Sequence, residues 1–298
     1  MLIEQDRRIS SLVHPASIIN ENVNIGKNVK VGPFSIIEDG VSIGNNTTIG
    51  NNTTICSGTT VGSNSKIFHN CSIGEIPQDL KFTGEETETI IGNNTIIREN
   101  VTINRGTSAL GKTTVGNNVL LMAAVHIAHD CIVKDNVIMA NMSTLGGHVE
   151  IQEYASLGGG VLVHQFCKIG SHVFIGGGFR AVQDVPPYIL AVGEPLRFGG
   201  INSIGLKRRG YSSDSISKIK KAYRMYFRSD LTRSIALEKM KEKLHQKETR
   251  DKEFADYEKK YLEEIEKTNV QNKKLKNELK QTEESLHEAR IALSLIHI

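Results

Sequence analysis

A six-residue period runs through the first two thirds of the chain and limits what it can fold into. Every sixth residue from Val13 to Ile175 gives 28 positions, of which 25 are aliphatic or methionine. The exceptions are Asp79, Glu85 and Ala109. A period of six turns a side chain by about 240° around an α-helix at each step, so it forms no single helical stripe. The repeat therefore indicates short strands separated by corners.

The residues after the aliphatic positions are suited to corners. The sequence reads IGNN at 43–46, 49–52 and 91–94, and VGNN at 115–118. Glycine and asparagine tolerate the positive φ angle that a tight corner requires. Three strands would close an 18-residue triangular coil, and stacked coils would bury an aliphatic column. Residues 13–180 therefore predict a parallel β-helix of roughly nine coils, shaped as a triangular prism.

Two segments interrupt the aliphatic column but keep its phase. They are IPQDLKFTGEET at 76–87 and RGTSALGK at 105–112. We expect each to be a loop that projects between coils. Loops on a rigid scaffold often carry binding residues, although a tolerated insertion is the alternative.

The chain changes character after residue 182, where QDVPPY (183–188) breaks the repeat. A helix is predicted from Asp214, capped by the cluster Ser212–Asp214. Its apolar stripe would consist of Ile216, Ile219, Tyr223, Tyr226 and Phe227. We therefore divide the chain into a β-helix acyltransferase domain (1–190), a basic helical region that binds carrier protein and nucleotide (191–240), and a tail (241–298). The functions given to the first two come from the resemblance described below.

The tail contains a long charged stretch, 251–293, with weak heptads. Its seam would hold Thr and Asn beside leucines, so a short coiled coil, a solvated single helix and a partly disordered segment are all open. We assign the tail no function.

The charge is distributed unevenly although the net charge is only +3. Residues 1–204 carry 13 Lys/Arg against 17 Asp/Glu, residues 205–233 carry 9 against 2, and residues 234–298 carry 14 of each. The basic segment 205–233 predicts an acidic partner. Nucleic acid is not favoured, because no aromatic-interleaved groove or reading motif accompanies the charge.

Composition also indicates where the protein works. No stretch approaches the ~18 apolar residues of a membrane span, and the first 15 residues lack the apolar core of a signal peptide. The four cysteines form no CxxC pair. We expect a cytoplasmic protein with reduced thiols.

Histidines gather between residues 125 and 164, in VHIAHDC (125–131), GGH (146–148) and VHQF (163–166). With 18 residues per coil, His129 and His148 should lie on neighbouring coils near one edge, with His164 similarly close and His126 half a repeat away. A histidine beside Asp130 suits proton abstraction from a hydroxyl or amine. A zinc site is the main competing reading, and solvated side chains are another.

Several motifs of this chain resemble the UDP-N-acetylglucosamine O-acyltransferases, which open lipid A biosynthesis in Gram-negative bacteria. The motifs are IGEIPQDLKFTGE (73–85), IRENVTINRGT (97–107), HIAHDC (126–131), HQFCKIG (164–170), QDVPPY (183–188) and GLKRRG (205–210). The resemblance covers roughly residues 12–235. A related N-acyltransferase family has an additional N-terminal domain, whereas this chain enters its repeats by residue 13, which favours the O-acyltransferases.

The resemblance implies an enzyme with a left-handed β-helix that assembles as a homotrimer, with active sites between adjacent prisms. It would transfer an (R)-3-hydroxyacyl chain from acyl carrier protein to the 3-position of UDP-N-acetylglucosamine. Acyl carrier protein is acidic and would dock on 205–233. Neither a cofactor nor a metal is expected, since the thioester donor is already activated, and no covalent acyl-enzyme is expected.

The resemblance also assigns roles to residues. His129 matches the general base, Asp130 the residue that orients it, and the Gly147 N–H the oxyanion donor. Gly177 matches the position that limits acyl-chain length. Substrate-contacting positions correspond to Gln78, Asp79, Lys81, His126, His148, His164, Gln165, Asn202, Arg208 and Arg209.

Two positions depart from the family pattern and leave open whether the accepting atom is a hydroxyl or a 3-amino group. Asn104 replaces a histidine and Ile204 a glutamate found in some members. Two other functions also stay open: a zinc hydratase on the same fold, and a non-catalytic trimeric scaffold that recruits a partner through the tail.

Overall fold

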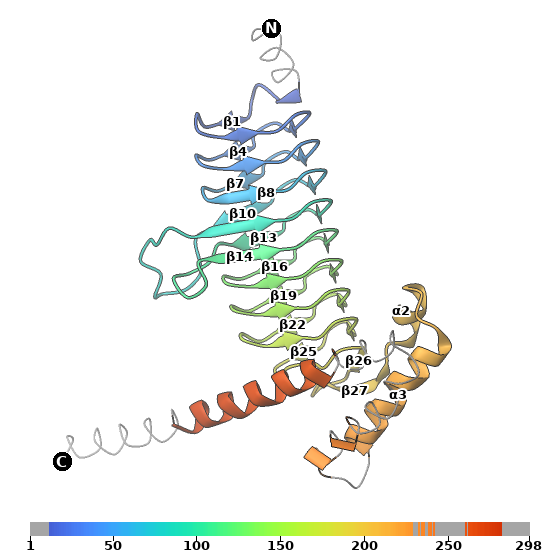
Figure 1. Cartoon of the computed structure of the whole chain (residues 1–298). Coiled ribbons are helices and arrows are strands. Elements are labelled where there is room, and N and C mark those ends of the chain that lie inside the picture. The colour runs from blue at the N-terminus through green and yellow to red at the C-terminus, as the bar shows by residue number, and fades with distance from the viewer. Residues whose placement is uncertain are drawn as a thin grey trace, which may run out of the picture. The chain divides into compact units, whose positions relative to one another are not determined.

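The computed structural model describes residues 12–228, 232, 234–235, 238–239, 241, 260 and 262–281. The chain forms two compact units, Met1–Ser217 and Lys218–Ile298. The first unit contains a parallel β-helix, as Figure 1 shows. The predicted fold class, a β-helix followed by a helical region, is confirmed.

Three parallel sheets form the sides of the β-helix. The first contains β1 (Ile18–Ile19), β4 (Ile36–Ile37), β7 (Thr54–Ile55), β10 (Ser72–Glu75), β13 (Thr102–Asn104), β16 (His126–Ile127), β19 (Thr144–Leu145), β22 (Leu162–Val163) and β25 (Arg180–Ala181). The second contains β2 (Asn24–Ile25), β5 (Ser42–Ile43), β8 (Thr59–Val61), β11 (Glu88–Ile91), β14 (Lys112–Val115), β17 (Ile132–Val133), β20 (Glu150–Ile151) and β23 (Lys168–Ile169). The third contains β3 (Lys30–Val31), β6 (Thr48–Ile49), β9 (Lys66–Ile67), β12 (Ile96–Ile97), β15 (Leu120–Leu121), β18 (Ile138–Met139), β21 (Ser156–Leu157), β24 (Phe174–Ile175), β26 (Ile189–Val192) and β27 (Arg197–Ile201).

The strand register shows where the chain leaves the coil. Most partners are 18 residues apart, as in the pair Ile18 and Ile36. The offset rises to 30 for Ser72 and Thr102, and to 24 for Thr102 and His126. The extra residues form two loops, 76–87 between β10 and β11, and 105–111 between β13 and β14. Both loops predicted from the gaps in the repeat are therefore confirmed.

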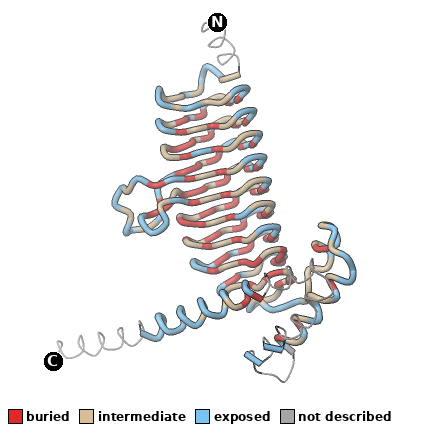
Figure 2. Tube along the Cα trace, viewed as in Figure 1, coloured by how far each residue is buried: buried red, intermediate tan, exposed pale blue. Residues whose placement is uncertain are grey.

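The core is the aliphatic column that the repeat predicts. Ile37, Ile73 and Ile127 are fully buried, and Figure 2 shows buried positions recurring in coil after coil. Ile19 and Ile25 are only partly buried. They belong to the first coil of the β-helix, where one side of the column has no described coil to cover it.

The corners adopt positive φ angles. Nine asparagines of the described residues have φ between 52° and 61°, which confirms the expectation that asparagine marks the corners. Later corners use other residue types, including Asp130, His148 and Phe166. A left-handed backbone is costly for most side chains, so these residues are held there by the stacked coils.

The β-helix ends in β26 and β27, which pair in antiparallel fashion. A short helix, α2 (Ser203–Arg208), follows, and the Asn202 side chain caps it by accepting a hydrogen bond from the Gly205 N–H. The predicted helix from Asp214 is α3 (Ser213–Arg228), and the Ser212 hydroxyl accepts a bond from the Ser215 N–H at its start.

The expected stripe of α3 is largely buried. Ile216, Tyr223 and Tyr226 are buried, Ile219 is half-buried, and Phe227 is exposed. No helix in the described part of the chain is long and apolar enough to cross a membrane.

The second unit contains a helix over residues 262–281. Asn269 donates a hydrogen bond of 2.7 Å to the Tyr226 hydroxyl, and Lys241 pairs with Glu266. Leu262 is buried. The helical part of the expected segment 251–293 is thus present over the described residues, and the rest of that segment lies outside them.

Candidate active site

Three stacked corners bring the predicted catalytic residues together. His129 and Asp130 follow β16, Gly147 and His148 follow β19, and Gln165 and Phe166 follow β22. Each pair stands 18 residues after the previous one, so equivalent positions lie above one another. The centroids of the His129 and His148 rings are 5.1 Å apart.

Phe166 is the ring that stacks on His148, with centroids 4.5 Å apart and planes 7° from parallel. The sequence analysis instead placed His164 near His148. His164 is exposed, and its Nδ1 donates to the Gln165 carbonyl oxygen at 3.1 Å. The coil repeat explains the difference, because the residue 18 positions after His148 is Phe166.

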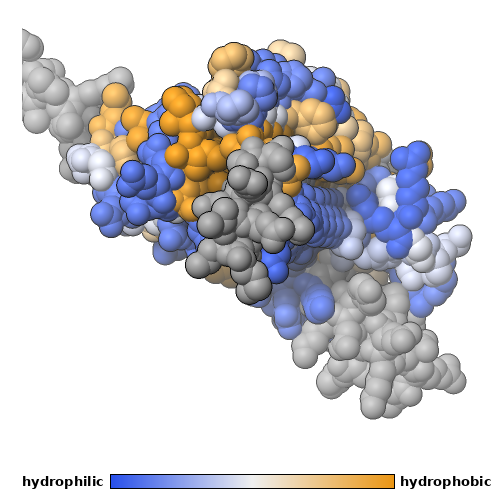
Figure 3. All heavy atoms as spheres, turned by 90° about the horizontal axis from the view of Figure 1, so that it is seen from above, coloured by the Kyte–Doolittle hydropathy of each residue, from blue (hydrophilic) through white to orange (hydrophobic). Residues whose placement is uncertain are grey.

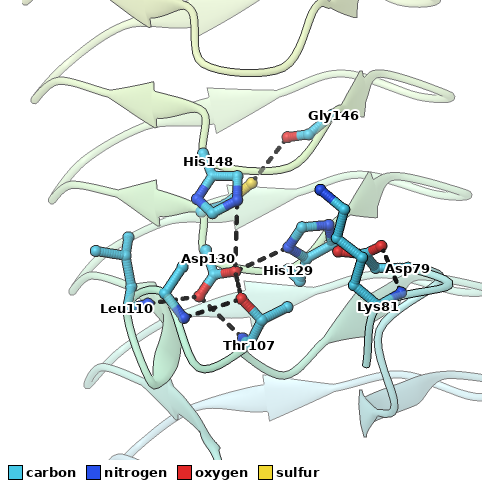
Figure 4. A network of polar contacts seen from close by, with 10 residues as sticks. Asp79, Lys81, Thr107, Leu110, His129, Asp130, Gly146 and His148 are labelled. Carbon is cyan, nitrogen blue, oxygen red and sulfur yellow. Dashed lines mark hydrogen bonds and ion pairs between the residues drawn. The ribbon is translucent and has the colours of Figure 1, made fainter. Parts of the chain in front are cut away.

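Asp130 lies at the centre of a hydrogen-bond network, which Figure 4 shows. Its side chain is fully buried. Oδ1 accepts from the N–H groups of Thr107 at 2.9 Å and Leu110 at 3.2 Å. Oδ2 accepts from the Thr107 hydroxyl at 2.6 Å and from His129 Nδ1 at 2.8 Å. The loop 105–111 therefore closes over this carboxylate.

These bonds determine the charge of Asp130. Burial alone would raise the pKa of its carboxyl group, but the bonds from the Thr107 hydroxyl and from His129 outweigh burial. The pKa of Asp130 lies below its ordinary value, so the group is an anion at neutral pH.

The bond to Asp130 also fixes the His129 ring. An ionised carboxylate only accepts hydrogen bonds, so His129 Nδ1 carries the proton. Nε2 then has a free lone pair. The His129 side chain is 14% exposed, which leaves this ring accessible to a substrate.

Gly147 lies directly against this ring. A Cβ atom at Gly147 would stand 2.7 Å from His129 Cε1 and 2.8 Å from Nε2. Only glycine allows the backbone to approach so closely. The Gly147 backbone is consequently close to the nitrogen that would move a proton.

The two neighbouring histidines are neutral at pH 7. His148 Nε2 lies 3.7 Å from Asp130 Oδ2, but burial is the largest effect and lowers the pKa of His148. Burial likewise lowers the pKa of His126, whose Nδ1 lies 2.8 Å from the Thr102 hydroxyl.

The loop 76–87 brings further predicted residues to the site. Asp79 and Lys81 lie beside His129 in Figure 4, and Asp79 Oδ1 accepts a bond from the Lys81 N–H at 3.0 Å. Gln78 lies in the same loop and is exposed. The base of the loop is held by Asn104, which donates to the Ile76 carbonyl oxygen at 2.8 Å.

The predicted nucleotide-sugar residues of the C-terminal part form a separate group. Asn202 caps α2, and the Arg209 guanidinium lies 5.2 Å from the centre of the Tyr154 ring. Arg208 and Gln165 are exposed.

Gly177, the predicted acyl-length position, is packed closely. A Cβ atom there would stand 3.1 Å from the Gly159 carbonyl oxygen. A side chain at this position would therefore require the backbone to shift slightly.

The same residues include one potential metal-ligating group among those described. Ligand atoms of His129, Asp130 and His148 lie within 4.8 Å of one another. Asp130 Oδ2 already accepts two hydrogen bonds, so a metal ion would have to displace them. The hydrogen-bond geometry favours a histidine–carboxylate pair.

Thr107 is the residue that sequence reasoning missed. It supplies two of the bonds to Asp130, although it stands 23 positions earlier in the sequence. Its only signal was its place at the end of IRENVTINRGT, beside the second gap in the repeat.

Comparisons with known proteins agree with this site. A model of bacterial transferase hexapeptide repeats matches residues 22–57 and 112–147, and one of UDP N-acetylglucosamine O-acyltransferase domain 2 matches residues 184–260. An acyl-[acyl-carrier-protein]–UDP-N-acetylglucosamine O-acyltransferase from Aliivibrio salmonicida is 47% identical over 230 residues, which cover 77% of this chain and 88% of the relative.

Solved structures give the same result. A UDP-N-acetylglucosamine acyltransferase from Bacteroides fragilis is 47% identical with a TM-score of 0.75, covering 76% of this chain and 89% of that one. The LpxA protein of Acinetobacter baumannii is 42% identical with a TM-score of 0.75, covering 77% and 90%. With its hexapeptide β-helix and the motifs gathered at this corner, the chain belongs to the UDP-N-acetylglucosamine O-acyltransferase family.

Proposed function

We propose that this enzyme transfers an (R)-3-hydroxyacyl chain from acyl carrier protein to the 3-hydroxyl of UDP-N-acetylglucosamine, the first step of lipid A biosynthesis. The observation that carries the proposal is the 2.8 Å bond from His129 Nδ1 to the buried Asp130 carboxylate. The bond orients the ring and leaves Nε2 as a base. The name of the Aliivibrio relative supplies the donor and the acceptor.

The reaction follows from this geometry. His129 Nε2 takes the proton of the sugar hydroxyl while its oxygen attacks the thioester carbonyl carbon. A tetrahedral intermediate forms, then the carbon–sulfur bond breaks and the departing thiolate receives the proton from His129. The acyl group passes directly to the sugar, with no covalent acyl-enzyme. Asp130 stabilises the imidazolium that exists between the two proton transfers.

The Gly147 N–H is our candidate for the oxyanion donor. Among the described residues, no acceptor is assigned to this N–H. It belongs to the residue that packs against the His129 ring, so it is near the carbon under attack. A donor already in place at the developing negative charge lowers the barrier of acyl transfer.

The substrate contacts divide between two groups. We assign Asp79, Lys81 and Gln78 of the loop 76–87, with the corner residues His126, His148, His164 and Gln165, to the sugar and the acyl end. We assign Asn202, Arg208 and Arg209 to the nucleotide, because a guanidinium pairs well with a diphosphate. Gly177 would admit a long acyl chain.

Two features support the partners. Lys207, Lys220, Lys221 and Arg224 are exposed on the basic segment 205–233, in keeping with the docking of an acidic carrier protein. Ile96, Ile138 and Phe174, each 36–39% exposed, project outward from the third sheet, and Figure 3 shows apolar surface exposed beside polar surface. A homotrimer would cover such a face.

Acyl transfer by the wild type and by His129→Ala tests the proposal. Donors would be 3-hydroxyacyl carrier proteins of several lengths, and acceptors UDP-N-acetylglucosamine and its 3-amino analogue. We expect transfer to the hydroxyl acceptor, with kcat reduced about 1,000-fold in His129→Ala. The exposed His69 provides a matched control, since His69→Ala should keep full activity. In the same assay, Gly177→Met should shift preference to shorter donors.

Two results would contradict the proposal. Unchanged activity of His129→Ala would remove its base. Absence of transfer by the wild type to either acceptor would remove the reaction itself. In the second case, stoichiometric metal in the purified protein would favour a hydratase at His129, Asp130 and His148.

A further inference from the structure

A second stack of rings stands at another corner of the β-helix. His172 lies between Tyr154 and Tyr188, with centroid distances of 4.9 Å and 5.4 Å and planes 9° and 14° from parallel. All three residues have φ between 58° and 65°. His172 is 9% exposed, so this stack holds a buried imidazole.

The same histidine holds the segment 202–211 to the β-helix. The Asn202 side chain donates to the His172 carbonyl oxygen at 2.9 Å, at the start of the segment. The Tyr211 hydroxyl lies 3.2 Å from His172 Nε2, at its end. The Asn202 N–H also donates to the Tyr188 carbonyl oxygen at 2.8 Å. One corner therefore fixes both ends of the segment that contains α2, Arg208 and Arg209.

Arg209 lies against this stack but is not saturated by it. Its guanidinium packs over the Tyr154 ring at 5.2 Å. Among the described residues, Nη1 of Arg209 and Nδ1 of His172 are buried polar atoms without a hydrogen-bond partner. Leaving such atoms unpaired is unfavourable. Stacking thus orients the guanidinium while its N–H groups stay available for an acceptor.

We propose that His172 is a positioning residue of the nucleotide-sugar site, which acts by holding Arg209 in the geometry that binds the diphosphate. The inference rests on the proposed function, since it requires Arg209 to contact the nucleotide. It adds a residue that the motifs did not single out and that touches no substrate itself.

The charge of His172 fits this role. Three phenols and one guanidinium face its ring, from Tyr154, Tyr188, Tyr211 and Arg209. Burial, and then the charge of Arg209, lower the pKa of His172 to about 4. The imidazole is therefore neutral at pH 7 and does not repel the guanidinium beside it.

Steady-state kinetics of the full-length enzyme test the inference. We expect His172→Ala to raise the KM for UDP-N-acetylglucosamine about ten-fold, with kcat and the KM for the acyl donor within about two-fold of wild type. His172→Phe keeps a stacking ring but loses the Tyr211 contact, so its KM should rise about three-fold. His69→Ala serves again as the control. If His172→Ala fails to fold, His172→Phe provides the test.

Comparison with Arg209→Ala separates the inference from the proposed function. Arg209→Ala should raise the same KM, and adding His172→Ala to it should raise KM no further, because His172 acts through Arg209. If Arg209→Ala raises KM while both His172 variants leave it unchanged, the inference is wrong and the proposed function stands. If Arg209→Ala leaves KM unchanged, both the nucleotide role of Arg209 and the inference are wrong. A fall in kcat alone would also overturn the inference.

Discussion

Asp130 occupies a left-handed corner, a conformation that most of the earlier corners give to asparagine. Its carboxylate is turned inward to Thr107 and Leu110 rather than to solvent. The loop 105–111 was expected to bind something outside the protein. It instead supplies three hydrogen bonds to a single buried side chain, and so it acts on the site through Asp130.

Thr107 should therefore control the His129–Asp130 pair. Thr107→Val removes the 2.6 Å hydroxyl bond to Asp130 Oδ2 and keeps the backbone bond. Bonds to charged groups are worth about 1.5–3 kcal/mol, so we expect kcat to fall about ten-fold or more. Thr107→Ser should restore activity. A pH–rate profile checks the mechanism, because loss of the bond raises the pKa of Asp130 and should move the acidic limb to higher pH. An unchanged profile would assign Thr107 to stability alone.

Gly147 gives a second prediction at the same scale. A Cβ atom there would collide with the His129 ring at 2.7 Å. In Gly147→Ala we expect the ring to move and the bond to Asp130 to break, with kcat reduced about 100-fold. The backbone of Gly147 is not in the positive-φ region, so the melting temperature should change little. Gly159→Ala is a matched control, since its Cβ would meet only one carbonyl oxygen at 3.4 Å. Equal activities of the two variants would contradict the prediction.

The residues of the site differ in how far they were predictable. Repeat arithmetic was sufficient for His129 and His148, which stand one coil apart. It failed for Phe166, because the histidines at 148 and 164 drew attention away from the 18-residue spacing. Thr107 could not be found in this way. Its bond to Asp130 crosses an extruded loop, whose path no periodicity describes.

At the scale of elements, the loop 76–87 depends on one side chain for its attachment. Asn104 is 3% exposed and donates to the Ile76 carbonyl oxygen at 2.8 Å, where the loop leaves β10. Beside it, the Arg105 Nε donates to the Gly74 carbonyl oxygen. The residue that departs from some family members thus ties down the loop that carries Asp79 and Lys81.

Removing this attachment should loosen substrate binding more than chemistry. In Asn104→Ala we expect the KM for UDP-N-acetylglucosamine to rise about five-fold while kcat changes less than about two-fold, because His129 and Asp130 keep their bonds. Hydrogen exchange of residues 76–87 should accelerate in the same variant. A large fall in kcat with unchanged exchange would mean that Asn104 takes part in the chemistry.

The elements themselves were mostly visible in the sequence. The strands and both loops follow the aliphatic phase, and α3 begins at the predicted serine cap. α2 was not foreseen. It is a six-residue helix whose stability comes from the Asn202 cap and from contacts with the β-helix, and local sequence preference does not reveal such contacts.

At the scale of the whole molecule, buried histidines make stability depend on pH. The pKa of His172 falls from 6.5 to about 4 on folding, and burial also lowers the pKa of His126 and His148. The unfolded chain therefore binds more protons than the folded chain between pH 6.5 and 4. Stability is fully present above pH 6.5 and falls as the pH falls through this window.

This acid sensitivity can be measured. His172 alone contributes a loss on the order of 3 kcal/mol between pH 6.5 and 4. We expect the urea midpoint of the wild type to fall across this range, and His172→Phe to show a shallower dependence. His69→Ala, which removes an exposed histidine, should keep the wild-type slope. Parallel slopes in all three proteins would show that His172 titrates normally.

The register offsets have a consequence for how such a chain can change in length. The offsets of 30 and 24 exceed the coil of 18 by two hexapeptides and by one. Asp79, Glu85 and Ala109, the three interruptions of the aliphatic series, lie in the loops that these extra units form. The loops behave as repeat units expelled from the wall, so the coils beyond them keep their phase. Substitution is open along the whole outer surface, whereas growth or loss occurs in steps of six, at ports that open beside His129.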